Sequence, residues 1–239
     1  MEKGQMLYEG KAKKIFATAD ADTVLVEYKD EATAFDGTKR GVIQSKGIVN
    51  NRMSAALFAL LESEGVPTHF IKTIDGRSML VKRLQIIPVE VVVRNRVAGS
   101  LATRLGLPEG TALRSPILET YYKSDELHDP MVCDSHILVM GWATPAQLQR
   151  IKELALRVNE VLRPFFLDRS LELVDFKLEF GLYKGEVVLG DEISPDTCRL
   201  WDIRTGEKMD KDRFRRDLGG EREAYVEVLQ RIEGGVHDV

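Results

Sequence analysis

Glu179 and Asp191 are the two residues whose types and spacing most clearly suggest chemistry. Segment 173–181 alternates polar and apolar residues, which predicts a β-strand with its charged side chains on one face. A turn at 183–186 would return the chain as a second strand over 186–191 and set Glu179 roughly opposite Asp191. Facing carboxylates repel each other, and a Mg²⁺ ion, which takes oxygen ligands and bridges to substrate phosphates, would remove that repulsion. The hairpin therefore predicts a magnesium site.

An ordinary amphipathic hairpin is the competing interpretation of the same pattern. The predicted charged face carries Asp175, Lys177 and Glu179, and Lys177 would soften the repulsion between the acids on either side of it. Charged faces usually lie in water. The hairpin alone favours the solvated face, so the other charged motifs of the chain must decide.

A pair of lysines near the N-terminus could hold phosphate groups. Two short predicted strands meet at Gly10, where the backbone can approach a ligand closely. Lys11 and Lys13 lie two residues apart, share a face and could bind phosphate oxygens. Neither the spacing nor a following helix matches a P-loop. A surface hairpin with solvated lysines is the alternative.

Arginines beside a predicted helix start form a second candidate anion site. Strand 86–96 ends with Arg94 and Arg96, and a helix is predicted to open at 97–100 and run through Leu105. The guanidinium fork, the Ser100 hydroxyl and the free N–H groups of the helix start would converge on an anion. Exposed arginines, with Ser100 acting only as an N-cap, are the alternative.

The overall composition is that of a soluble globular protein. The 239 residues are 44% hydrophobic and 30% charged, with a net charge of −4. An acidic chain has no electrostatic footprint for nucleic acid, and no apolar stretch reaches the length of a membrane span. Cys133 and Cys198 match neither a disulfide framework nor a metal motif, so a reducing, cytoplasmic location is expected.

The predicted elements around these motifs are mainly antiparallel strands. The first part has strands within 7–16 and over 23–28, 68–74 and 79–84, a turn at 34–38, and a core-facing helix over 47–64 with Ser45 as a possible N-cap. The second part has strand 86–96, an irregular polar region over 107–141, a helix over 145–168, a basic helix start over 209–216 and a terminal helix over 221–232. Any boundary near residue 84 would be a hinge between two packed lobes.

Over essentially its whole length the chain resembles the phosphoribosylaminoimidazole-succinocarboxamide synthase (SAICAR synthetase) family. Four stretches support the resemblance: Tyr8–Lys13, the Phe35-Asp36-Gly37 turn, Ile86–Arg94 continued to Ser100, and Leu173–Gly181. The loop Ile43-Gln44-Ser45-Lys46-Gly47 departs from the family, in which a proline often precedes Lys-Gly.

The resemblance implies an α+β fold with two lobes, ATP-grasp-like, spanning residues 1–84 and 85–239 with the nucleotide between them. It also implies that ATP, L-aspartate and the carboxylated aminoimidazole ribonucleotide (CAIR) give SAICAR, ADP and phosphate through an acyl phosphate. A homodimer or higher homo-oligomer is a family expectation. A small-molecule kinase and a non-catalytic nucleotide-binding module are the rival classes.

The resemblance also implies site residues. Glu179 and Asp191 would hold Mg²⁺. ATP would be bound by Gly10, Lys11, Ala12, Lys13, Lys123 and the connection that carries Val81, Lys82 and Leu84. The 5′-phosphate of the ribonucleotide would be held by Arg94, Ser100 and Arg199, its ribose by Asp175, its carboxylate by Lys177, and a further substrate contact would come from Asp196. Asp36 and Asp129 would lie near the amine or the aspartate substrate, as catalytic residues together with Lys177 and Asp175.

Overall fold

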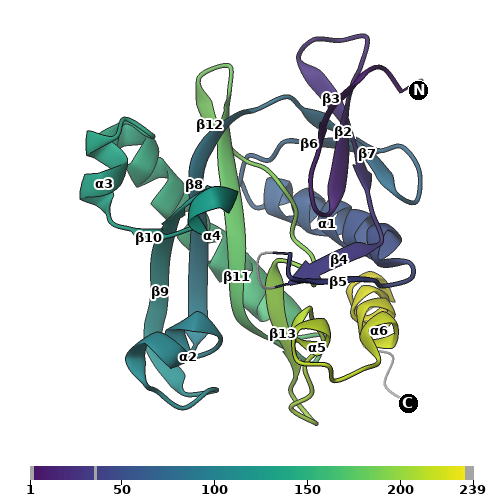
Figure 1. The fold of residues 1–239 in the computed structure, drawn as a ribbon, viewed down its shortest axis with the longest axis vertical. Coiled ribbons are helices and arrows are strands. Elements are labelled where there is room, and N and C mark those ends of the chain that lie inside the picture. Colours follow the sequence, from purple (N-terminus) through teal and green to yellow (C-terminus); the bar gives the residue numbers. More distant parts are fainter. Residues whose placement is uncertain (1–2, 35–36, 235–239) are drawn as a thin grey trace.

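The computed structural model describes residues 3–34 and 37–234 and contains two main antiparallel sheets (Figure 1). The first sheet is built from the N-terminal part of the chain. Its order is β1 (Met6–Glu9), β2 (Lys13–Ala17), β3 (Thr23–Tyr28), β7 (Ser78–Lys82) and β6 (Phe70–Thr73). A separate hairpin of β4 (Glu31–Ala34) and β5 (Lys39–Val42) lies below it in the view of Figure 1.

Two residues separate the end of β7 from the first strand of the second sheet, β8 (Gln85–Arg96). The order of this sheet is β10 (Met131–Val132), β9 (Ala112–Tyr122), β8, β11 (Leu171–Tyr183) and β12 (Glu186–Leu189), and β13 (Cys198–Asp202) also pairs with β11. The long strand β11 is therefore the centre of this sheet. The strands of this sheet pair antiparallel, which confirms the α+β class.

The β11–β12 hairpin forms as the sequence predicts. Lys184 and Gly185 occupy its two-residue turn with φ values of 51° and 89°, the left-handed conformations that a tight hairpin turn requires. Phe180 pairs with Leu189 and Tyr183 with Glu186. The apolar face of β11 enters the core, as the alternation requires.

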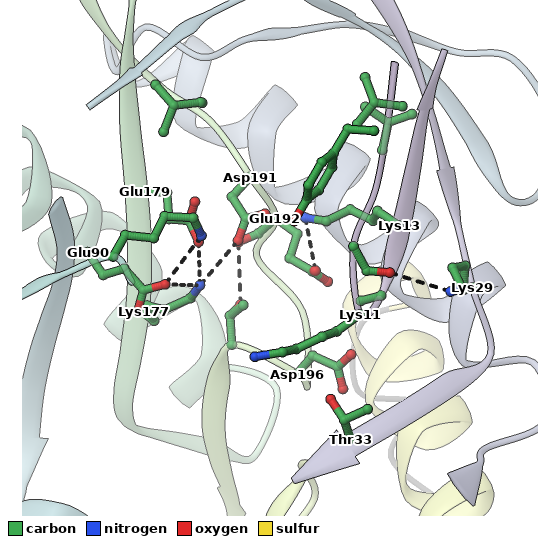
Figure 2. Close-up of a pocket in the computed structure, with 18 of the residues that line it drawn as sticks. Lys11, Lys13, Lys29, Thr33, Glu90, Lys177, Glu179, Asp191, Glu192 and Asp196 are labelled. Atoms are coloured by element: carbon green, nitrogen blue, oxygen red, sulfur yellow. Dashed lines mark hydrogen bonds and ion pairs between the residues drawn. The ribbon is translucent and has the colours of Figure 1, made fainter. Parts of the chain in front are cut away.

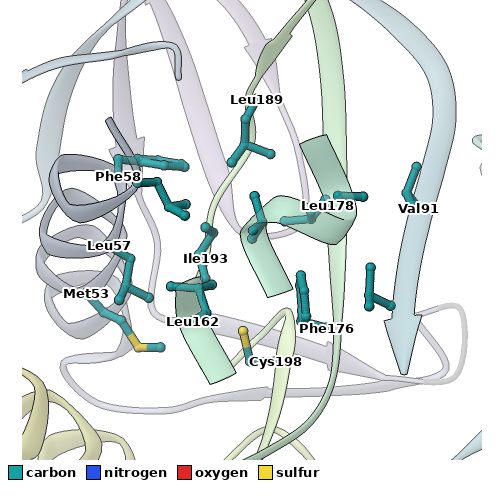
Figure 3. Close-up of a cluster of buried hydrophobic side chains, with 14 of the residues drawn as sticks. Met53, Leu57, Phe58, Val91, Leu162, Phe176, Leu178, Leu189, Ile193 and Cys198 are labelled. Carbon is teal, nitrogen blue, oxygen red and sulfur yellow. The ribbon is translucent and has the colours of Figure 1, made fainter. Parts of the chain in front are cut away.

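One hydrophobic cluster joins the two sheets (Figure 3). It takes side chains from α1 (Lys46–Ser63), α4 (Pro145–Leu167) and β11, among them Met53, Leu57, Phe58, Leu162, Phe176 and Leu178. Each large apolar side chain that is removed from water contributes about 1.5–3 kcal/mol. Since this core is continuous across residue 84, the division into lobes 1–84 and 85–239 stays a prediction.

The long helices α1 and α4 cover the sheets on the side away from the polar face of β11. α1 packs on β3, β6 and β7, and α4 packs on β8, β9, β11 and β12. α6 (Glu221–Gly234) lies against α1 (Figure 1). Both α1 and α4 agree with the predicted helices, but the side chain of Ser45 makes no cap hydrogen bond although the residue occupies the N-cap position. Among the described residues no helix is long and apolar enough to cross a membrane.

The prediction of an irregular region over 107–141 is wrong. This region contains β9, the short helix η1 (Asp125–Leu127), β10 and α3 (Asp134–Val139). Pro116 obscures the strand in the sequence because proline cannot donate to a sheet. The register shift between Arg94 and Arg96 opposite it shows that Pro116 lies in an irregular part of the ladder.

The basic segment near the C-terminus also differs from its prediction. It forms only α5 (Asp212–Arg215), its N-cap residue Lys211 makes no side-chain cap, and Asp212 is 2% exposed. The helix that opens after Gly99 runs as expected to Leu105, as α2 (Ser100–Leu105). The 34–38 turn falls in the β4–β5 hairpin, and its residues 35–36 lie outside the described part of the chain.

His69 should make the stability of the protein fall in mild acid. Its ring packs edge-on against Phe58, and its Nε2 is buried without a hydrogen-bond partner among the described residues. Burial lowers the pKa of His69 to about 3, from 6.5. Below pH 6.5 the unfolded chain therefore binds a proton that the folded chain excludes, so the free energy of unfolding falls as the pH falls from 6.5 towards 3.

The expected size of the His69 effect is about 2 kcal/mol between pH 7.5 and pH 5. Urea unfolding at the two pH values should show that His69→Gln removes this part of the pH dependence. His136→Gln, at an exposed histidine of α3, serves as the control and should behave like the wild type. The prediction would be contradicted if the free energy of unfolding of His69→Gln changed between pH 7.5 and pH 5 as much as that of the wild type.

Candidate active site

A cleft of about 1440 Å³ lies between the two sheets. It is lined by all of the site residues predicted from the sequence except two. Ser100 is exposed and does not line the cleft, and Asp36 falls outside the described residues. Figure 2 shows lysines of the first sheet and acids of the second facing each other across this space. The chain thus brings together residues that are far apart in sequence.

The charged face of β11 points into the cleft and is not solvated. Asp175 and Glu179 are 3% and 5% exposed. The sequence predicted Asp191 opposite Glu179, but the hairpin register places Gly190 there, with its N–H donating to the Glu179 carbonyl at 2.9 Å. Asp191 follows with a φ of 57°, and its side chain lines the cleft. The two carboxylates therefore meet one residue away from the predicted register.

Lys177 connects the acids of the cleft (Figure 2). Its Nζ lies 2.5 Å from Glu179 Oε1 and 3.6 Å from Asp191 Oδ2. Lys123 donates to Glu179 Oε1 at 2.8 Å. On the opposite side Lys13 binds Asp191. The carboxylates are thus neutralised by lysines from three segments.

Lys177 is held in its charged form. Burial opposes that charge, but Glu179, Asp191 and Glu90 outweigh burial and hold the pKa of Lys177 well above its usual value. Burial and the Asp191 charge would each raise the pKa of Glu179, but Lys177 and Lys123 keep it below the usual value. Lys177 is therefore a fixed positive charge at neutral pH and cannot accept a proton.

The acidic donors fit Mg²⁺ only in partnership with other ligands. Glu179 and Asp191 offer carboxylate oxygens close to each other. These carboxylates already bind the ammonium groups of lysines, so the site accommodates positive charge. Among the described residues no group of three or more His, Cys, Asp or Glu side chains could enclose a metal. Mg²⁺ commonly uses one or two carboxylates and completes its shell with phosphate and water. The donor set therefore suits a metal that arrives with a phosphate ligand.

A second cluster of charges forms around Asp175. The sheet register places Asp175 between Arg94 on β8 and Arg199 on β13. Their guanidinium groups donate to Asp175 Oδ2 at 2.7 Å and 2.9 Å. Arg94 also donates to Ser100 Oγ at 2.9 Å, at the first residue of α2. Two arginines held by a shared carboxylate form a fixed donor array for an anion.

Gly99 should be intolerant of a side chain because of its place beside Arg199. Its φ is 52°, and an added Cβ would lie 2.5 Å from Arg199 Nη2 and 2.7 Å from Arg199 Cζ. Gly99→Ala should displace this guanidinium. If Arg199 holds the ribonucleotide, as the resemblance implies, binding of the ribonucleotide should weaken roughly 10-fold or more, since an anion site depends on its geometry. Isothermal titration with CAIR and, separately, with ADP measures the two affinities; only the first should fall.

Gly106→Ala is the matched control for Gly99→Ala. Gly106 also has a positive φ, 63°, but an added Cβ would meet nothing within 4 Å. The backbone disfavours a Cβ at both positions, with ψ of −131° at Gly99 and 30° at Gly106, and only at Gly99 does the added Cβ also collide with Arg199. Equal CAIR affinities of the two variants would contradict the placement of Arg199 in the site.

The side of the cleft where the resemblance places the nucleotide is formed by the first sheet. Gly10, Lys11 and Ala12 lie in the bend between β1 and β2, and Lys11 Nζ lies 2.7 Å from Asp125 Oδ1 at the exposed rim. The two lysines predicted to share a face therefore bind different carboxylates. Val81, Lys82 and Leu84 line the cleft where β7 ends.

The two described aspartates assigned to other parts of the substrates differ in their surroundings. Asp129 accepts a hydrogen bond from the backbone N–H of Ser124 at 2.8 Å, which fixes the loop at the rim of the cleft. Asp196 is buried among Lys46, Asn50 and Tyr225. Both also line the cleft.

Several cleft residues were missed from the sequence. Glu90 faces Glu179 across the β8–β11 pair and accepts from Lys177 at 3.1 Å. Its signal was visible, because it is the one charged residue in the apolar run 86–93. Arg215, within the predicted basic helix start over 209–216, also lines the cleft, and it donates to Asp212 Oδ1, three residues earlier, at 2.6 Å. Its place at the cleft depends on the packing of α5 against β4, which leaves no local pattern in the sequence.

The two cysteines lie in different surroundings, and only Cys198 is at the cleft. Cys198 lines the cleft, but burial raises the pKa of its thiol far above the usual value. Cys133 is exposed at the start of α3 and is not a cleft residue.

Comparison with known proteins identifies relatives along the whole chain. The family model described as SAICAR synthetase matches residues 6–232. A phosphoribosylaminoimidazole-succinocarboxamide synthase of Desulfitobacterium hafniense is 58% identical over 238 residues, with 100% of both chains covered. The crystal structure of the corresponding synthase of Ehrlichia chaffeensis superimposes with a TM-score of 0.94 at 47% identity, covering 98% of this chain and 100% of that one. A SAICAR synthetase in complex with ADP gives a TM-score of 0.92 at 50% identity, covering 97% and 99%.

Proposed function

The chain belongs to the SAICAR synthetase family, and from that premise we propose which residues of the cleft perform each part of the reaction. The protein is an ATP-dependent carbon–nitrogen ligase of purine biosynthesis. It joins L-aspartate to the carboxylate of CAIR and gives SAICAR, ADP and phosphate. Its fold is the ATP-grasp-like α+β fold of this family.

Activation of the CAIR carboxylate is the difficult part of the reaction. A carboxylate does not acylate an amine unaided, because oxide would have to leave. Transfer of the γ-phosphoryl group of ATP to a carboxylate oxygen gives an acyl phosphate, and attack by the amine of aspartate then expels phosphate. Catalysis of such a transfer rests on positioning and on neutralising negative charge.

The lysines of the cleft are suited to this task. Lys13 and Lys11 would bind the phosphates of ATP as they leave Asp191 and Asp125, and Gly10 and Ala12 allow the backbone to approach. Lys123 would bind the nucleotide from the second sheet. The connection with Val81, Lys82 and Leu84 would hold adenine through its backbone. Lys177 would bind the carboxylate of CAIR and stabilise the negative charge that develops there.

Glu179 and Asp191 would hold Mg²⁺ together with phosphate oxygens of ATP, for which their paired carboxylates supply suitable ligands. The bound metal would neutralise charge on the transferring phosphoryl group. Lys177 and Lys13 keep both carboxylates ionised and ready for a cation before the nucleotide arrives.

The arginine cluster would bind the ribonucleotide. Arg94 and Arg199 would donate to the 5′-phosphate, with Ser100 fixing Arg94 and completing the helix start. Asp175, which joins the two arginines, would also reach the ribose hydroxyls. Asp196 would contact the substrate deeper in the cleft, and Asp129 and Asp36 are proposed near the amine or the aspartate substrate.

One observation carries this assignment: two charged clusters lie in a single cleft. The lysine–carboxylate cluster suits a metal-bound polyphosphate, and the separate arginine cluster suits a second phosphate. An enzyme that transfers a phosphoryl group from ATP to a phosphorylated substrate requires both. A non-catalytic nucleotide-binding module has no use for the second.

The coupling of ADP release to amide formation tests the function. Purified protein with Mg²⁺-ATP and CAIR should release ADP only when L-aspartate is present, and SAICAR should appear in equal amount. ADP release that is indifferent to aspartate would indicate a kinase. No release from folded protein would indicate a binding module.

We further propose that the enzyme works in the cytoplasm as a homodimer or higher homo-oligomer, as expected of the family, and that residues 1–84 and 85–239 act as its two lobes. The change of sheet between β7 and β8 supports that boundary. Its substrates are small molecules, and the acidic net charge of −4 argues against nucleic acid as a partner.

A further inference from the structure

A polar stripe runs along the face of α1 that was expected to pack only as core. Lys46, Asn50 and Ser54 are spaced four residues apart, so they lie one above another on the helix. They are 1%, 0% and 0% exposed. A buried polar stripe costs stability unless its groups have partners. Here all three side chains donate to one short segment, 192–196, although Asn50 Oδ1 has no partner among the described residues.

Segment 192–196 is held along its length by these three side chains. Ser54 exchanges hydrogen bonds of 3.2 Å with the backbone N–H and carbonyl of Ile193. Asn50 donates to Glu192 Oε2 at 3.1 Å and to Asp196 Oδ2 at 3.0 Å. Lys46 Nζ donates to Asp196 Oδ2 at 2.6 Å. The stripe therefore ends on the carboxylate of Asp196.

The terminal helix completes the cage around this carboxylate. Tyr225 of α6 is 1% exposed and donates its hydroxyl to Asp196 Oδ1 at 2.7 Å. Both carboxylate oxygens are thus bound from the side away from the cleft, while Asp196 still lines the cleft (Figure 2). A carboxylate held by three donors has one orientation.

We propose that Lys46, Asn50 and Tyr225 are positioning residues for the reaction, which fix the carboxylate of Asp196 towards the bound substrate and make α6 a functional part of the cleft. The proposal rests on the assignment of Asp196 to the substrate site. The proposal adds residues of α1 and α6 to the site. No residue of these two helices had been assigned a role there.

The arrangement is poorly explained by stability alone. Burying an ion pair such as Lys46–Asp196 removes two charges from water, and apolar residues of similar volume are often as stabilising. The ion pair and its hydrogen bonds instead fix the geometry of the Asp196 carboxylate. In an active site a displacement of about 1 Å can cost about 100-fold in rate.

Tyr225→Phe tests the proposal with the smallest change, since it removes one hydroxyl and keeps the ring in place. The expected result is a roughly 10- to 100-fold loss of kcat/KM for CAIR, with unchanged ADP affinity. Arg231→Met is the matched control: Arg231 joins α6 to Asp202 with Nη2 to Oδ2 at 2.7 Å and does not touch Asp196. This control should lose stability but keep its kinetics. Kinetics of Tyr225→Phe within twofold of the wild type would overturn the proposal.

Lys46→Met provides a second readout, the pH profile. Asp196 is faced by Lys46, by Tyr225, by Lys211 at 4.0 Å and, through the shared Asn50, by Glu192, while Arg215 lines the same cleft. Against the effect of burial, Lys211 and Lys46 hold the pKa of Asp196 below its usual value, so loss of Lys46 should raise that pKa and move the acid limb of kcat/KM for CAIR to higher pH. A profile identical to the wild type would contradict the positioning role, because a purely structural loss would lower activity at every pH.

Asp196→Asn separates the two levels of the inference. If this variant keeps wild-type kinetics, the assignment of Asp196 to the substrate site fails, and the positioning role fails with it. If Asp196→Asn is impaired while Tyr225→Phe and Lys46→Met are not, the site assignment stands and the positioning role is overturned.

Discussion

Asp191→Asn should abolish turnover, with a loss of about 1,000-fold or more, while the protein remains folded. The substitution keeps the size of the side chain and removes the charge that Lys13 and Lys177 face. A carboxylate that helps hold a metal against transferring phosphate oxygens contributes several kcal/mol to the transition state, and about 4 kcal/mol corresponds to a factor of 1,000. Lys13 retains Glu192, at 3.1 Å, so the fold keeps a counter-ion there.

The measurement is steady-state SAICAR formation over a titration of Mg²⁺, with circular dichroism to check the fold. Asp134→Asn is a suitable control because Asp134 is exposed on α3 and binds Lys152 away from the cleft. Glu179→Gln should behave like Asp191→Asn. If either carboxylate variant kept wild-type turnover and Mg²⁺ dependence, the metal assignment would be wrong.

Arg94→Met should lower the free energy of unfolding by about 3 kcal/mol or more, the largest stability effect among the substitutions proposed here. It should also abolish CAIR binding. Arg94 is 3% exposed and donates to Asp175 and Glu119, both at 2.7 Å. Removal of one partner from a buried ion pair typically costs about 3–5 kcal/mol, since it leaves charge buried without compensation. Arg199 still binds Asp175, and Arg104 still binds Glu119, which places the expected value at the low end.

Urea unfolding measures the first effect of Arg94→Met, and titration with CAIR under folding conditions measures the second. Arg114→Met, at an exposed arginine of β9, should change neither by more than about 0.5 kcal/mol. Arg94→Lys should also be impaired, because an ammonium group cannot replace the fork that reaches Asp175, Glu119 and Ser100 together. Full CAIR affinity in Arg94→Met would contradict the phosphate assignment.

Local patterns in the sequence were sufficient for the parts of the site that lie on single strands. The alternation in β11 placed Asp175, Lys177 and Glu179 on one face, and Lys184-Gly185 marked the turn that returns the chain to Asp191. The register was nevertheless off by one residue at Asp191. A left-handed residue after the strand rotates its side chain into the cleft, and alternation cannot foresee such a rotation.

Contacts between distant segments were beyond the reach of these patterns. Helical spacing in α1 made its apolar residues conspicuous, and the polar stripe that ends on Asp196 has meaning only when segment 192–196 and α6 are in place. β9 was hidden by Pro116, which lies where the ladder is irregular. The family resemblance supplied the reaction and the residue roles, whereas the structure supplied the partners of each charge.

The central claim is that this cleft brings ATP and CAIR together, so that the γ-phosphoryl group is transferred to a carboxylate oxygen of CAIR. The fate of the carboxylate oxygens of CAIR tests this claim most directly. CAIR labelled with ¹⁸O at both carboxylate oxygens would be converted with Mg²⁺-ATP and L-aspartate. The ¹⁸O content of the released phosphate would be measured by mass spectrometry. Transfer through an acyl phosphate predicts one labelled oxygen in each phosphate and one retained in the amide. Phosphate without label would show that ATP is cleaved by water, which contradicts the proposed chemistry of the cleft.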